Sequence, residues 1–126
     1  MMPREMRIII AEDDDTLRLL LQLQLEDVED IQIVGAAATA NDALRVTEEH
    51  HPDAAVIDVR MPGVEGAQLI AELRHRHPDM GLVAYSSSAG VAVGRQLAEM
   101  GIPLVLKGEV AMLVDALRTS VDQSAA

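Results

Sequence analysis

Short apolar runs alternate along the chain with longer segments in which apolar residues recur at helical spacing. Four of the runs show no alternation of polar and apolar residues, which is typical of strands buried on both faces of a parallel sheet. A fifth run contains a glutamine and a glycine and is expected to form a more exposed strand. The expected strands are residues 8–11, 31–38, 54–57, 82–85 and 102–106, with 31–38 as the exposed one.

The segments between these runs are expected to be helices. They cover residues 16–28, 39–49, 65–74, 91–100 and 109–121. A strand followed by a helix, repeated five times, predicts an α/β fold with a parallel sheet and right-handed crossovers.

The first expected helix carries more leucine than one buried face requires. Its predicted core face is Leu17, Leu20, Leu21, Leu25 and Val28. Leu19 and Leu23 fall roughly opposite that face. They are either two ordinary exposed leucines or part of a patch on which a partner docks.

A His-Pro-Asp sequence occurs twice, at residues 51–53 and 77–79, each time between an expected helix and a buried strand. A histidine near a helix C-terminus suits the helix dipole, and the proline ends the helix. We therefore interpret these histidines as helix terminators. His75 and His77 are two positions apart and would not share a helix face, which argues against a metal-binding pair there.

Composition limits the classes of function. The 126 residues suit one domain (1–126, with a core of about 5–122 and a tail or linker start at 123–126), and there is no cysteine for a disulfide or a thiolate metal site. The formal charge of -11 argues against direct binding of nucleic acid or of an anionic membrane by this domain. No signal peptide or membrane-spanning run is recognised, so a cytoplasmic location is expected.

Polar and charged residues follow the expected strands where a parallel sheet would place a ligand, at the carboxyl ends. Residues 12–15 supply four acids, Asp58 follows the third strand, residues 86–88 are serines, and Lys107 follows the fifth strand. Each has an ordinary structural explanation when taken singly, since Asp14 or Asp15 can cap a helix and serines are common in loops. Their joint placement at one edge of the sheet is better explained by a functional site.

The chemistry of such a cluster points to phosphoryl transfer. Several carboxylates in one crevice repel each other unless a cation joins them, and carboxylate oxygens suit Mg²⁺. An aspartate beside Mg²⁺ can attack a phosphoryl group and form an aspartyl-phosphate. A lysine and a serine can bind the phosphoryl oxygens. The sequence therefore predicts a phosphoryl-acceptor site.

Four segments resemble the receiver domain of bacterial two-component response regulators, and the resemblance extends over about residues 5 to 122. They are Ile-Ile-Ile-Ala-Glu-Asp at 8–13, Val-Ile-Asp-Val-Arg-Met-Pro-Gly-Val-Glu-Gly at 56–66, Val-Ala-Tyr-Ser-Ser at 83–87 and Leu-Val-Leu-Lys at 104–107. The resemblance implies a doubly wound, flavodoxin-like parallel sheet of five strands in the order 2-1-3-4-5 with five helices. A chemotaxis protein of the same family has this strand order.

The resemblance also implies roles for individual residues. Asp58 would be the phosphoacceptor, Ser86 the switch hydroxyl and Lys107 the contact to the phosphoryl group. Glu12, Asp13, Asp58 and the carbonyl of Arg60 would hold Mg²⁺, while the Arg60 side chain either folds over the site or points into solvent.

A histidine kinase or a histidine phosphotransfer protein would be the phosphodonor, and a homodimer is a candidate assembly. Phosphorylation would alter the surface of the fourth helix, fifth strand and fifth helix. The chain would have no enzymatic activity beyond its own phosphorylation and dephosphorylation.

Two positions depart from the family pattern. Gly108 follows Lys107 where a proline is usual, so the loop there is expected to be looser or differently bent. Leu104 stands where the family often has a tyrosine or phenylalanine that reorients on activation. Tyr85 is the chain's only aromatic residue, so coupling of Ser86 to the output surface is expected to run through aliphatic packing or the loop.

Three other functions compete with this interpretation. A haloacid dehalogenase-type hydrolase needs a second acid two residues after its aspartate, but that position is Arg60. A flavodoxin-like binder would have a Ser/Thr-rich phosphate loop after the first strand, where this chain has four acids. A receiver-like scaffold that binds partners without phosphorylation remains the main alternative.

Overall fold

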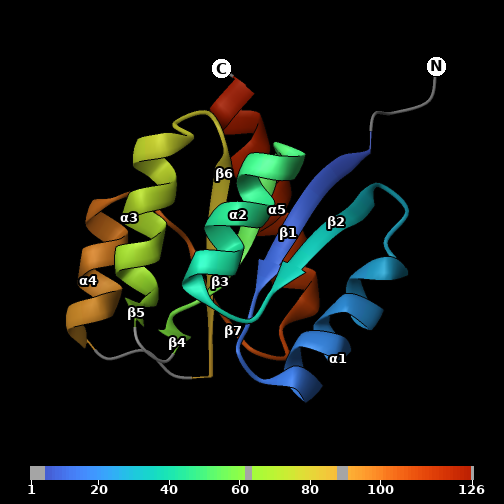
Figure 1. Cartoon of the computed structure of the whole chain (residues 1–126), viewed down its shortest axis with the longest axis horizontal. Coiled ribbons are helices and arrows are strands. Elements are labelled where there is room, and N and C mark those ends of the chain that lie inside the picture. Colours follow the sequence, from blue (N-terminus) through green and yellow to red (C-terminus); the bar gives the residue numbers. More distant parts are fainter. Residues whose placement is uncertain (1–4, 62–63, 88–90, 126) are drawn as a thin grey trace.

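A five-stranded parallel sheet forms the centre of the computed structural model, which describes residues 5–61, 64–87 and 91–125. Its strands lie in the order β2-β1-β3-β6-β7 (Figure 1). A separate antiparallel pair, β4 and β5, follows β3 directly. With that pair left out, the order is the expected 2-1-3-4-5, which confirms the predicted fold. The strands are β1 Met6–Ala11, β2 Ile31–Ala37, β3 Ala54–Asp58, β4 Arg60–Met61, β5 Val64–Glu65, β6 Gly81–Ser86 and β7 Leu104–Leu106.

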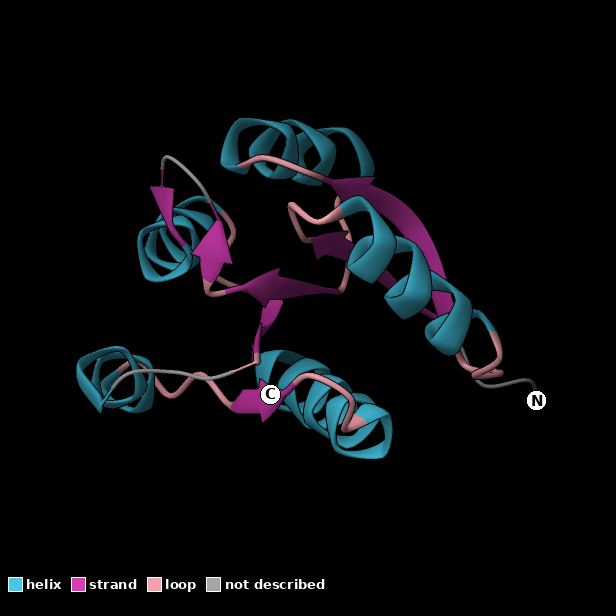
Figure 2. Cartoon of the chain, turned by 90° about the horizontal axis from the view of Figure 1, so that it is seen from below, coloured by secondary structure: helices cyan, strands magenta, loops and turns pink. Residues whose placement is uncertain are grey.

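In the part of the chain that the structure describes, five helices cover the two faces of the sheet (Figure 2). They are α1 Asp15–Glu26, α2 Ala40–His50, α3 Gly66–Arg76, α4 Val91–Glu99 and α5 Val110–Ala125. Residues of α1 and α5 pack with Ile8 and Ile10 of β1, whereas residues of α2, α3 and α4 pack with Ile9 and Ala11. Because both faces of the sheet are covered, the central strands are apolar without alternation, as the sequence pattern indicated.

Some element boundaries differ from the prediction. β7 begins at Leu104 rather than at residue 102, because Pro103 has no N–H for the ladder and contributes only its carbonyl, which accepts from the N–H of Ala84. α5 continues to Ala125, past the expected end at residue 121, because residues 121–125 contain neither glycine nor proline. The β4–β5 pair was not expected, since two-residue strands are too short to show a period. Pro62 and Gly63 of the quoted motif lie outside the described residues.

α1 buries a narrower face than its leucines suggested. Leu21 and Leu25 are buried, but Leu17 and Leu20 are 39% and 48% exposed, so their predicted place in the core is wrong. α1 packs against β1 and β2, and β2 is the edge of the sheet, so little of the molecule lies beyond the buried stripe of the helix. Leu19 and Leu23 are exposed as expected. We call the four exposed residues, Leu17, Leu19, Leu20 and Leu23, the α1 leucine patch.

Both His-Pro-Asp segments end helices, as predicted. His51 caps α2 in the left-handed conformation, with φ of 47°. The N–H of His77 donates to the carbonyl of Leu73 at 2.8 Å, one residue past the end of α3. The two segments lie before β3 and β6, at the amino ends of the strands. Across the described ranges, none of the helices combines the length and apolarity that a bilayer crossing requires.

Candidate functional site

Three acidic residues meet at the carboxyl end of the sheet. β1 and β3 pair in parallel, with Ala11 opposite Ile57, so the residues that follow both strands lie side by side. Glu12, Asp13 and Asp58 each place a carboxylate oxygen within 4.8 Å of the other two. Glu12 and Asp58 are buried, at 3% and 4% exposure. The sequence prediction that these three acids would converge is therefore matched by their positions.

Lys107 brings a positive charge to the same cluster. Its Nζ lies 2.6 Å from Glu12 Oε1 and 3.3 Å from Asp58 Oδ2. The N–H of Lys107 donates to the carbonyl of Ser86 at 2.8 Å, which fixes the backbone of the lysine to the end of β6. The structure thus brings Lys107 into direct contact with two of the acids and places Ser86, which is itself buried, at the end of the neighbouring strand.

Asp58 is held by its own backbone neighbours. The N–H of Arg60 donates to Asp58 Oδ1 at 3.0 Å, so the two carboxylate oxygens of Asp58 have different partners. The N–H of Val59 donates to the carbonyl of Tyr85 at 3.2 Å, which fastens the chain after β3 to β6. Arg60 is exposed, and it contacts the carboxylate through its backbone.

Burial and mutual charge shift the pKa values of Glu12 and Lys107. Burial raises the pKa of Glu12 from 4.5 to about 7, and the neighbouring Asp58 adds to the rise while Lys107 opposes it. Burial by itself would lower the pKa of Lys107, but the carboxylates of Glu12 and Asp58 outweigh it, and the pKa is raised. Glu12 therefore changes its charge near neutral pH, while Lys107 stays a cation.

The residues of this cluster fit a divalent cation. Glu12 Oε2 is buried and has no hydrogen-bond partner among the described residues, so one strong acceptor of the cluster lacks a donor. Three convergent carboxylates provide the hard oxygen ligands that Mg²⁺ prefers. The Arg60 carbonyl as a further ligand stays a prediction.

One contact beside the site was not foreseen from the sequence. The N–H of Gly108 donates to the Tyr85 hydroxyl at 2.9 Å. The sequence feature that could have indicated this contact is the position of Tyr85. It is the chain's only aromatic residue and directly precedes Ser86 at the end of a strand.

Comparison with known proteins places the chain among signalling domains. A family model described as response regulator receiver domain matches residues 8–117. The transcriptional regulatory protein YhcZ of Bacillus subtilis (strain 168), named as uncharacterized, is 38% identical over 82 residues, which are 65% of this chain and 38% of the relative. The response regulator GacA of Pseudomonas viridiflava is 33% identical over 78 residues, which are 62% of this chain and 36% of the relative.

Solved structures agree with this placement. The crystal structure of a two-component response regulator of the LuxR family from Aurantimonas sp. SI85-9A1 matches with a TM-score of 0.86 and 25% identity, over 94% of this chain and 86% of that chain. The signal receiver domain of the putative response regulator NarL from Mycobacterium tuberculosis matches with a TM-score of 0.81 and 25% identity, over 98% of this chain and 99% of that chain. The matched region is less than two fifths of the length of the two curated relatives.

Proposed function

This chain belongs to the family of response regulator receiver domains, and on that premise we propose that it is a switch that accepts a phosphoryl group on Asp58. The observation that carries the proposal is the buried Asp58 carboxylate, 3.3 Å from Lys107 Nζ and grouped with Glu12 and Asp13. A structural ion pair would need one acid for one lysine. Here Lys107 contacts two acids, and Asp13 lies beside them, which leaves the site short of positive charge.

The proposed reaction is a simple displacement at phosphorus. A carboxylate oxygen of Asp58 attacks the phosphorus atom, an oxygen–phosphorus bond forms, and the bond to the donor breaks with its electron pair remaining on the donor. Glu12, Asp13, Asp58 and the carbonyl of Arg60 would hold Mg²⁺, which supplies positive charge that offsets the repulsion between the two anions. Lys107 stabilises the transferred group through its ammonium charge.

The new charge would then act on the buried end of β6. We expect the Ser86 hydroxyl to donate to the phosphoryl group, which repacks the loop after β6 and the surface of α4, β7 and α5. Water later hydrolyses the aspartyl-phosphate and resets the switch. The chain would catalyse only this phosphorylation and its reversal.

Replacing Asp58 with asparagine is expected to abolish phosphoryl uptake, because the amide is not a competent nucleophile. The native chain incubated with acetyl phosphate and Mg²⁺ should gain the mass of one phosphoryl group in intact-protein mass spectrometry, and Asp58→Asn should gain none. Asp79→Asn, at an exposed residue near the amino end of β6, is the matched control and should be modified like the native chain.

A native chain that neither acetyl phosphate nor beryllofluoride modifies in the presence of Mg²⁺ would contradict the proposal. That result would favour the second candidate, a receiver-like scaffold that binds partners without phosphorylation. Equal modification of the native chain and of Asp58→Asn would also overturn the assignment of Asp58.

The α1 leucine patch supports a protein as the physiological phosphodonor. A small hollow is lined by Leu17 and Leu20 of this patch and by Lys107, which contacts Glu12 and Asp58. A donor helix that covers exposed leucines there would bring its phosphohistidine close to Asp58. We propose that the partner is a histidine kinase or a histidine phosphotransfer protein; a homodimer stays a prediction.

The double variant Leu17→Ser, Leu20→Ser is expected to slow phosphotransfer from a protein donor by roughly tenfold, because two apolar contacts beside Lys107 would be lost. The donor is a phosphotransfer protein first shown to phosphorylate the native chain, and transfer is followed with radiolabelled phosphate. Phosphorylation by acetyl phosphate should be unchanged. Met112→Ser, at an exposed apolar residue of α5, is the control. Equal slowing with both donors would refute docking at this patch.

A further inference from the structure

Tyr85 is hydrogen-bonded to the backbone on both sides of the acidic cluster. Its carbonyl accepts from the N–H of Val59, the residue after Asp58, at 3.2 Å. Its hydroxyl accepts from the N–H of Gly108, the residue after Lys107, at 2.9 Å. The proposed reaction gives this side chain no role. Tyr85 nevertheless ties the segment carrying the nucleophile to the loop carrying the lysine.

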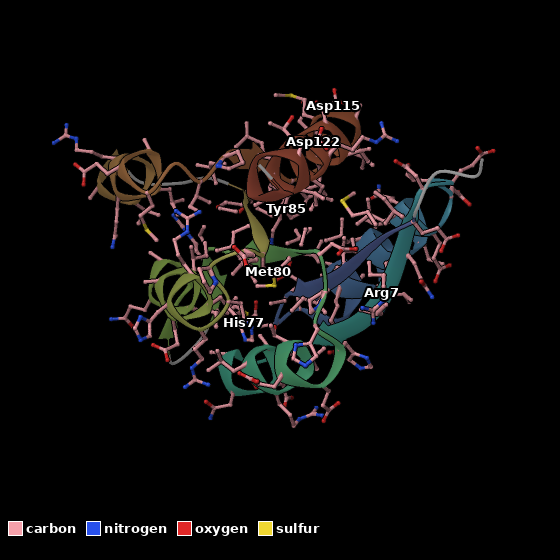
Figure 3. All side chains as sticks on the ribbon, turned by 90° about the horizontal axis from the view of Figure 1, so that it is seen from above. Arg7, His77, Met80, Tyr85, Asp115 and Asp122 are labelled. Atoms are coloured by element: carbon pink, nitrogen blue, oxygen red, sulfur yellow. The ribbon has the colours of Figure 1, made fainter. Side chains whose placement is uncertain are left out.

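The side chain reaches the loop from within the core. Tyr85 is buried and packs in the layer formed by α1, α5 and the sheet, where it lies beneath α5 (Figure 3). Its strand neighbours are Asp58 in β3 and Val105 in β7. A phenol anchored in this way moves little, so its hydroxyl is a fixed point for the loop.

Two consecutive N–H groups of the loop bind to two consecutive residues of β6. The N–H of Lys107 donates to the carbonyl of Ser86 at 2.8 Å, and the N–H of Gly108 donates to the hydroxyl of Tyr85. Gly108 adopts a φ of 97°, a conformation that glycine accepts readily. A proline at position 108 would have no N–H to donate. The glycine therefore makes this second hydrogen bond available.

The placement of the loop matters because Lys107 contacts both Glu12 and Asp58. Lys107 Nζ lies closer to Glu12 Oε1, at 2.6 Å, than to Asp58 Oδ2, at 3.3 Å. To bind a phosphoryl group on Asp58, the ammonium has to move from the first carboxylate towards the second. A backbone fixed on both sides of the lysine confines that movement to the side chain and keeps the ammonium within reach of Asp58.

We propose that Tyr85 is a positioning residue, which holds the Lys107 loop through its hydroxyl so that the ammonium can reach a phosphoryl group on Asp58. This inference rests on the proposed function. It differs from a purely structural role for Tyr85, because packing needs only the ring, whereas positioning needs the hydroxyl.

The variant Tyr85→Phe separates the two roles, since it keeps the ring and removes the acceptor. With acetyl phosphate and Mg²⁺, we expect the maximal rate of Asp58 phosphorylation to fall several-fold, with little change in the half-saturating concentration of acetyl phosphate. Amide hydrogen exchange at Gly108, followed by NMR, should become faster in the variant. Leu117→Val, in the same core layer but about two turns into α5, should lower the melting temperature and leave the rate and the exchange at Gly108 unchanged.

The outcomes distinguish this inference from the proposed function. If the native chain is phosphorylated and Tyr85→Phe matches it in rate, the positioning role is overturned and the proposed function stands. If the native chain takes up no phosphoryl group, both fall. A slower rate in Tyr85→Phe with unchanged exchange at Gly108 also overturns the inference, because the hydrogen bond would not be the cause.

A second measurement keeps the test decisive if Tyr85→Phe does not fold. Because the chain has a single tyrosine, growth on fluorotyrosine labels position 85 alone. Fluorine withdraws electron density from the ring, so the labelled hydroxyl is a weaker acceptor for the N–H of Gly108. The labelled chain should be phosphorylated more slowly by acetyl phosphate and should exchange the Gly108 amide faster; an unchanged rate with unchanged exchange would overturn the inference.

Discussion

Replacing Lys107 with methionine should lower the free energy of unfolding of the metal-free protein by about 3 kcal/mol at pH 8. The substitution keeps most of the side-chain volume and removes the charge. Glu12 and Asp58 are then left as buried carboxylates without their cation, and removal of one partner from a buried ion pair costs far more than the pair contributes. Because Lys107 is itself 18% exposed, the expected loss of stability is at the lower end of what breaking a buried ion pair costs.

The loss should be smaller at pH 5. Glu12, with its pKa raised to about 7, is protonated there and needs no cation. Urea denaturation at both pH values measures the difference. Arg118→Met is the matched control: Arg118 pairs with Asp30 at 2.7 Å on the surface, so its loss should cost less than about 1 kcal/mol at either pH. Similar losses for the two variants, or the same loss for Lys107→Met at both pH values, would contradict this account.

The native, metal-free protein should lose stability as the pH rises from 5 to 8. The pKa of Glu12 is 4.5 in the unfolded chain and about 7 in the folded one, so between these values the folded state holds a proton that the unfolded state has released. The free energy of unfolding therefore falls with rising pH in this window. At about 1.4 kcal/mol for each pH unit, the contribution of Glu12 is on the order of 3 kcal/mol, present in full below pH 4.5 and lost above about pH 7.

Glu12→Gln should remove most of this dependence, because the amide stays neutral throughout. Glu72→Gln is the control, since Glu72 pairs with Arg76 at the half-exposed surface of α3, and it should keep the native slope. Melting temperatures measured between pH 4.5 and 8 give the slopes. Addition of Mg²⁺ should raise the stability of the native protein most near pH 8, where Glu12 is ionised. A slope in Glu12→Gln equal to the native one would assign the effect to other groups.

The residues that could be predicted from the sequence were those whose surroundings follow from the topology alone. Uninterrupted apolar runs predicted the central strands, and parallel strands necessarily place their carboxyl ends at one edge. The meeting of Glu12 and Asp58 followed from that rule without any knowledge of side-chain geometry. The charge of -11 excluded some partners but did not indicate which acids would meet.

What could not be predicted depends on distances between elements. Leu17 and Leu20 have helical spacing typical of a core face, yet the edge position of β2 leaves them exposed. The hydrogen bond from Gly108 to Tyr85 joins residues 23 positions apart, and no periodic pattern encodes it. The raised pKa of Glu12 likewise depends on how deeply its carboxylate is buried.

The two core layers give the end of β6 a further property. Alternate residues of a strand point to opposite faces: Ala84 packs with the α2–α3–α4 layer and Tyr85 with the α1–α5 layer, so the pleat directs Ser86 back to the first layer. Neighbouring residues at this end of β6 thus face opposite sides of the molecule beside Asp58. Phosphorylation of Asp58 would affect the two faces of the sheet through different residues. A substitution within one core layer could then change the response of one face and leave that of the other intact.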